Sequence, residues 1–116
     1  MGITIWHNPR CSKSRQTLEL LRSKGIEPAI REYLKQPPSK AEVETLIAQV
    51  GGDAALLIRD GEPEFKKLKM KKADLSKSDI AKAIVAHPVL LQRPVVVSGK
   101  KAAIGRPPEA VLALLK

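Results

Sequence analysis

Residues 3–34 read ITIWHNPRCSKSRQTLELLRSKGIEPAIREYL, and this stretch decides the fold. Ile3–Trp6 is short, β-branched and aromatic, which predicts a first strand. A helix is predicted over about 12–24, because Gly25 is a typical stop. Ala29–Leu34 is predicted to be a second strand. A strand–helix–strand unit joins two parallel strands through a right-handed crossover.

The last quarter of the chain predicts a hairpin followed by a helix. Val95–Val97 has the composition of a strand, and Ala102–Ile104 is predicted to return antiparallel to it. Ser98–Lys101 between them predicts a tight turn, with glycine first in a two-residue loop. Pro107 or Pro108 suits the first turn of a final helix.

The middle of the chain is predicted to be helical. Ser39–Glu42 has the form of a capping box, and Ser76–Asp79 is a second box-like start. Between them lies Lys66–Lys72, where five of seven residues are lysine. The length of 116 residues fits one domain. The prediction is therefore a single α/β domain over 1–116, with a thioredoxin-like βαβ…ββα order, a mixed sheet and a helical insertion over about 39–87.

The amino-acid composition indicates which partners and which cellular compartment to expect. Lysine and arginine number 21 against 12 acidic residues, and the net charge of +9 favours anionic partners. One cysteine forms no internal disulfide, so nothing indicates an oxidising compartment. No apolar run approaches the roughly 20 residues of a membrane span, and the N-terminus lacks the pattern of a signal peptide. The expectation is a soluble cytoplasmic protein with no membrane partner.

Cys11, the only cysteine, is either a small buried apolar residue or a nucleophile. It precedes the predicted helix, where free N–H groups and the helix dipole stabilise a thiolate. Arg10, Lys13 and Arg15 add positive charge nearby, and Ser14 is placed to direct its hydroxyl back toward the sulfur. This polar, cationic setting favours a nucleophile.

Other cysteine chemistries fit the spacing less well. A C-x-x-C redox pair needs a second cysteine where Ser14 stands, and a Cys-x5-Arg phosphate loop needs arginine where Thr17 stands. A zinc site needs three or four ligands, and beyond Cys11 only His7, His87 and carboxylates are candidates. No metal is therefore expected.

Three motifs together resemble the glutaredoxin-type arsenate reductase (ArsC) family, in a short version with Cys-Ser-Lys-Ser-Arg. They are HNPRCSKSR at 7–15, RPVVV at 93–97 and IGRPPE at 104–109. The resemblance runs from about Ile3 to the C-terminus. It implies a site with Cys11 as nucleophile, His7, Asn8 and Ser14 in its loop, Arg59, Arg93 and Arg106 as substrate-binding arginines, and Pro94 as a cis proline facing the cysteine.

The cysteine and the three arginines that the resemblance implies are suited to arsenate, the substrate that it implies. Arsenate is an oxyanion, and arginine donates paired charge-assisted hydrogen bonds to such anions. The resemblance implies that the Cys11 thiolate attacks arsenate to form a covalent adduct. Glutathione then acts as co-substrate, arsenite leaves, and glutaredoxin removes glutathione from the mixed disulfide. No bound cofactor is implied, and the absence of a second cysteine agrees with an external thiol.

Three other functions remain as alternatives. One is a thiol-dependent oxidoreductase of the same fold with another substrate. Another is a regulator that resembles the Spx family and docks on RNA polymerase, although Ser14 removes the C-x-x-C switch of that family. Nucleic-acid binding is disfavoured, because lysine runs such as Lys66–Lys72 are usually solvated faces. Stacking on single strands needs exposed aromatic residues, and the three in this chain supply little.

Overall fold

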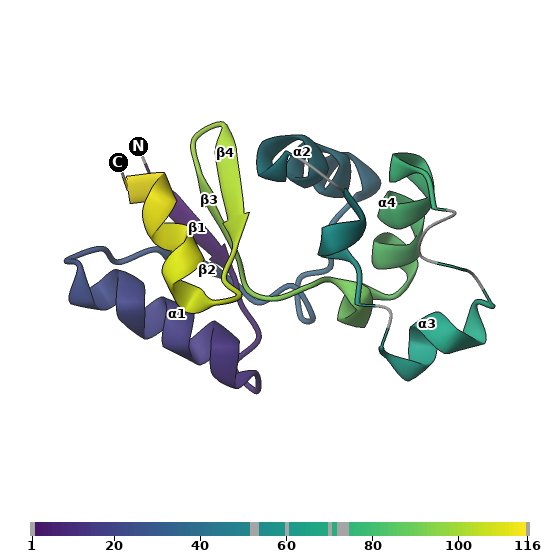
Figure 1. Cartoon of the computed structure of the whole chain (residues 1–116), viewed down its shortest axis with the longest axis horizontal. Helices are drawn as coiled ribbons and strands as arrows, with labels where there is room; N and C mark the ends of the chain where they lie inside the picture. The colour runs from purple at the N-terminus through teal and green to yellow at the C-terminus, as the bar shows by residue number, and fades with distance from the viewer. Residues whose placement is uncertain (1, 52–53, 60, 70, 72–74, 116) are drawn as a thin grey trace. The chain divides into compact units, whose positions relative to one another are not determined.

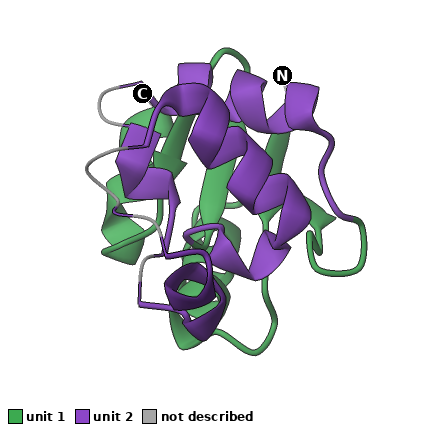
Figure 2. Cartoon of the chain, turned by 90° about the vertical axis from the view of Figure 1, so that its right-hand side faces the viewer, with its two compact units in different colours: residues 1–36, 93–116 green, residues 37–92 purple. Residues whose placement is uncertain are grey.

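The computed structural model describes residues 2–51, 54–59, 61–69, 71 and 75–115. The chain divides into two compact units, coloured separately in Figure 2. Unit 1 comprises residues 1–36 and 93–116, and unit 2 comprises residues 37–92. Within the lysine-rich run predicted at 66–72, Met70 and Lys72 lie outside the described residues.

Unit 1 contains a four-stranded mixed sheet with the order β2-β1-β3-β4 (Figure 1). The strands are β1 (Ile3–Trp6), β2 (Ala29–Arg31), β3 (Val95–Ser98) and β4 (Lys101–Ile104). β1 pairs parallel to β2 and antiparallel to β3, and β3 pairs antiparallel to β4. The predicted thioredoxin-like arrangement is thereby confirmed.

The second strand is shorter than predicted, because β2 ends at Arg31 rather than at Leu34. The backbone N–H of His7 donates to the carbonyl of Arg31 over 2.8 Å, which closes the ladder. The chain then turns, and the N–H groups of Lys35 and Gln36 both donate to the carbonyl of Glu32, each over 2.9 Å. These bonds satisfy the backbone locally, so the strand does not continue.

Two helices complete unit 1: α1 (Ser12–Ser23) and the 3-10 helix η4 (Pro108–Leu115). They pack against each other, and η4 also packs on β4. The buried cluster between these helices and the sheet is wholly aliphatic, as the scarcity of aromatic residues requires. It consists of Ile5, Leu18, Leu21, Val96 and Val111.

Unit 2, residues 37–92, is helical and extends beyond both ends of the insertion predicted over about 39–87. Its elements are α2 (Lys40–Val50), η1 (Ala54–Leu57), α3 (Pro63–Lys67), α4 (Lys77–Ala86) and η3 (Pro88–Leu90). Both predicted capping boxes are present, with Ser39 paired to Glu42 and Ser76 paired to Asp79. Across the described residues of both units, no helix combines the length and the apolar character that a bilayer crossing needs.

Two loops of unit 1 meet beside α1. The Arg93–Pro94 peptide is cis, as expected, and the Arg106–Pro107 peptide is also cis. Gly105 lies between them and donates its N–H to the carbonyl of Pro94 over 2.9 Å. A Cβ at Gly105 would lie 2.6 Å from Thr17 Oγ1 and 2.8 Å from Pro94 Cγ. The close packing of the Gly105 backbone against the side chains of Thr17 and Pro94 therefore depends on glycine.

Gly105→Ala is expected to destabilise the protein by about 2 kcal/mol, because the added methyl group overpacks a site bounded by Thr17 and Pro94. Urea denaturation followed by circular dichroism measures the change. Gly2→Ala is the matched control, because a Cβ there meets nothing within 4 Å. Equal stability of the two variants would show that the loop moves aside at little cost.

Candidate active site

The loop before α1 is held by a buried hydroxyl. The Oγ of Ser14 lies 2.6 Å from His7 Nδ1 and accepts a 3.0 Å hydrogen bond from the backbone N–H of Asn8. Cys11 is the N-cap residue of α1, and its own N–H donates to the carbonyl of Asn8 over 3.0 Å. The expectation that the Ser14 hydroxyl faces the sulfur is therefore wrong, since that hydroxyl is engaged by the loop.

His7 supports the loop as a neutral ring. Burial lowers the pKa of His7 below its ordinary value, with Glu32 opposing the shift and the cations Arg22 and Arg15 adding to it. At neutral pH the imidazole is therefore mostly uncharged. Its contribution to the site is the hydrogen bond with Ser14, and it adds no positive charge beside the thiol.

The half-buried sulfur of Cys11 is surrounded by donors. Burial raises its pKa, but the backbone N–H of Ser14, the side chain of Arg93 and the backbone N–H of Lys13 outweigh burial, and the pKa of Cys11 is lowered overall. The two backbone donors belong to the first turn of α1, where N–H groups have no partner within the helix. The fold thus favours the thiolate that the sequence predicted.

Two arginines from distant loops reach this sulfur. Nη2 of Arg106 lies 3.5 Å from Cys11 Sγ, and Nε of Arg106 donates to the carbonyl of Arg93 over 2.8 Å. Arg93 precedes cis Pro94 and β3, and Arg106 follows β4. The antiparallel β3–β4 hairpin brings its two ends together, so both guanidinium groups lie beside the thiolate.

The remaining predicted arginines have other contacts. Nη1 of Arg15 donates to the carbonyl of Pro9 over 2.8 Å, so Arg15 braces the loop that precedes the cysteine. Arg59 belongs to unit 2, where its Nη1 lies 2.5 Å from Oε1 of Glu62. A role for Arg59 in binding the substrate stays a prediction.

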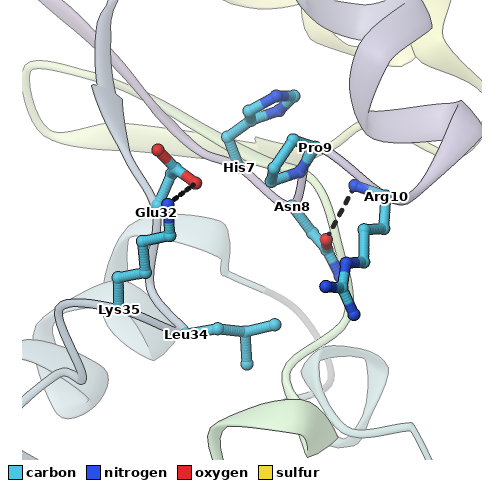
Figure 3. A pocket seen from close by; sticks show the side chains of 7 residues that line it. All are labelled: His7, Asn8, Pro9, Arg10, Glu32, Leu34 and Lys35. Carbon is cyan, nitrogen blue, oxygen red and sulfur yellow. Dashed lines mark hydrogen bonds and ion pairs between the residues drawn. The ribbon is translucent and has the colours of Figure 1, made fainter.

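A pocket of about 270 Å³ opens beside the cysteine loop (Figure 3). It is lined by His7, Asn8, Pro9, Arg10, Glu32, Leu34 and Lys35. Glu32, Leu34 and Lys35 were not predicted to be part of the site. They reach it because β2 pairs parallel to β1, which places the ends of both strands at the same edge of the sheet. The weak sequence signal was that both loops follow predicted parallel strands.

The alkylation rate of Cys11 is expected to follow a pH midpoint below the free value of about 8.5, because the donors around the sulfur lower its pKa. The rate should fall as the pH drops through this lowered pKa. Iodoacetamide trapping followed by mass spectrometry measures this profile, with free glutathione as reference. A midpoint equal to that of glutathione would contradict an activated thiolate.

The fold and the site define a thioredoxin-like α/β protein with a single cysteine at the start of α1, where its pKa is lowered. The model of the ArsC family matches residues 6–114, and the chain belongs to that family.

Relatives that match nearly the whole chain agree with its membership of the ArsC family. An arsenate reductase of Haemophilus influenzae is 44% identical, covering 99% of this chain and 100% of that protein. An arsenate reductase of Rhizobium meliloti is 42% identical, covering 99% of this chain and 82% of that protein. The solved structure of an arsenate reductase from Vibrio cholerae superposes with a TM-score of 0.92 at 40% identity, covering 98% of both chains.

Proposed function

We propose that this protein is an arsenate reductase that works through Cys11 and takes its electrons from glutathione, with glutaredoxin regenerating the free thiol. The observation that carries the proposal is the convergence of Arg93 and Arg106 on the Cys11 sulfur. A thiolate beside two guanidinium groups combines a nucleophile with a clamp for a tetrahedral oxyanion. The names of the relatives select arsenate among such anions.

The proposed first step forms a sulfur–arsenic bond. The Cys11 thiolate attacks arsenic, and one arsenate oxygen leaves as water after taking up protons. The guanidinium groups of Arg93 and Arg106 stabilise the charge on the remaining oxygens. We assign Arg59 as a third binding arginine, as the family resemblance implies.

The proposed second step uses an outside thiol. Glutathione displaces another arsenic oxygen, and the two sulfurs then join as a disulfide. Their two electrons reduce arsenic from the pentavalent to the trivalent state, and arsenite leaves. Glutaredoxin attacks the disulfide and releases Cys11. The chain has one cysteine, so it holds no resolving thiol of its own. The need for reduced glutathione leads us to place the reaction in the cytoplasm.

The test is a coupled assay of arsenate-dependent NADPH oxidation with glutathione, glutaredoxin and glutathione reductase. The expected result is turnover that requires arsenate, glutathione and glutaredoxin together. Replacing arsenate with phosphate is the control, because phosphate has a similar shape and is not reduced by thiols. No turnover with a fast-reacting Cys11 would instead favour a thiol oxidoreductase of this fold with another substrate.

A further inference from the structure

The proposed mechanism leaves one buried polar group without a role. Tyr33, the only tyrosine of the chain, lies in the turn after β2, and its side chain is 0% exposed. Within the described residues its hydroxyl meets no partner at full hydrogen-bond geometry. A buried hydroxyl without a partner costs free energy that a phenylalanine would avoid. The hydroxyl therefore calls for a functional explanation.

The hydroxyl lies within the electrostatic field of the active site. Burial raises the pKa of Tyr33 above its ordinary value, the guanidinium of Arg93 and the side chain of Asn8 oppose the shift, and the charge of Cys11 adds to it. The phenol consequently stays protonated at neutral pH and keeps an O–H group to donate. All four of these residues belong to unit 1.

The two side chains that form hydrogen bonds with the phenol, those of Arg93 and Asn8, act as donors. A guanidinium carries only donors, so Arg93 can give hydrogen bonds to the phenol oxygen and accept none. The hydrogen bond from the side chain of Asn8 lowers the pKa of the phenol, which is the effect of an N–H group that donates to the phenol oxygen. The O–H of Tyr33 still lacks an acceptor of good geometry, and Cys11, whose charge acts on the phenol, is where an anion is expected to bind.

We infer that the Tyr33 hydroxyl donates a hydrogen bond to an oxygen of the tetrahedral oxyanion bound at Cys11, which makes Tyr33 a substrate-binding residue. The inference rests on the proposed function, because it requires an oxyanion at this cysteine. The bound anion supplies the acceptor that the described residues of the free protein lack. Tyr33 is thus a neutral donor beside the charged donors Arg93 and Arg106.

The test compares wild type with Tyr33→Phe, using sodium arsenate and inorganic phosphate as probes. Each anion is titrated for its ability to protect Cys11 from iodoacetamide in the absence of glutathione. Loss of a hydrogen bond to a charged group is expected to raise the half-protecting concentration about tenfold. The melting temperature should stay unchanged or rise, because the hydroxyl makes no hydrogen bond of full geometry that the substitution would remove.

Thr45→Val is the control for removal of a hydroxyl elsewhere. Thr45 Oγ1 donates to the carbonyl of Ala41 within the exposed face of α2, over 2.9 Å, and its loss should leave anion protection unchanged. Equal half-protecting concentrations in wild type and Tyr33→Phe would overturn the inference and leave the proposed function standing. A large fall in the melting temperature of Tyr33→Phe would also overturn it, by showing a structural role. Failure of both anions to protect wild type would overturn the inference and the oxyanion site together.

Discussion

Cys11→Ser is expected to abolish arsenate-dependent NADPH oxidation, with a loss of at least about 1,000-fold. A serine hydroxyl does not ionise at neutral pH, so the donors that stabilise the Cys11 thiolate have no comparable anion to favour. The chain has no second cysteine that could replace the nucleophile. The coupled assay with glutathione, glutaredoxin and glutathione reductase measures the loss directly.

The loss should be chemical and not structural. Cysteine and serine differ by one atom, and the Cys11 backbone would still serve as the N-cap of α1. The melting temperature of Cys11→Ser is therefore expected to stay within a few degrees of wild type. Turnover that survives in the variant would assign the nucleophile to another residue and would refute the proposed mechanism.

Arg93→Ala is expected to lower kcat/KM for arsenate about 100-fold. Arg93 acts on the Cys11 sulfur both through a hydrogen bond and through its charge, and the proposal also makes it part of the anion clamp. Hydrogen bonds to charged groups contribute roughly 1.5–3 kcal/mol each. Loss of the bonds from Arg93 to the thiolate and to the arsenate therefore accounts for the roughly 100-fold fall in kcat/KM. Arg93→Lys should recover part of the loss, because it keeps the charge but not the paired donors.

The same variant should shift the pH profile of alkylation. Without the guanidinium the pKa of Cys11 rises, so the thiolate fraction at neutral pH falls and the midpoint of the alkylation rate moves to higher pH. Lys101→Ala is the matched control, because Lys101 begins β4 at the far end of the hairpin and its removal also deletes one positive charge. Equal midpoints in Arg93→Ala and wild type would show that Arg93 does not support the thiolate.

Local sequence patterns allowed most of the secondary structure of unit 1 and the helix starts of unit 2 to be predicted from the residues alone. The strand–helix–strand start, the final hairpin and the two capping boxes depend on neighbours within a few positions, so their residue types suffice to indicate them. The position of Cys11 at the start of α1 is of the same kind. Because backbone N–H groups are free at any helix start, the lowered pKa of the thiol was also predictable.

The directions of the side chains at the site could not be predicted in this way. Ser14 is correctly placed beside the cysteine, but packing turns its hydroxyl toward His7 and leaves its backbone N–H for the sulfur. Arg15 is one helical turn from Cys11 in sequence, yet its guanidinium bonds to the carbonyl of Pro9. Several rotamers satisfy such a local pattern equally well, and contacts with other segments select one.

The assembly of the anion site depends on contacts between residues far apart in the chain. Arg106 is 95 positions from Cys11 and reaches its sulfur because β1 pairs with β3 and β3 pairs with β4. Tyr33 reaches the same place because β2 pairs with β1 and then ends early. The sequence shows which donor groups the chain contains. The distances between these groups and the Cys11 sulfur depend on strand register and on burial. For this reason Cys11 could be predicted as the nucleophile from the residues alone, whereas the buried hydroxyl of Tyr33 was revealed by the fold.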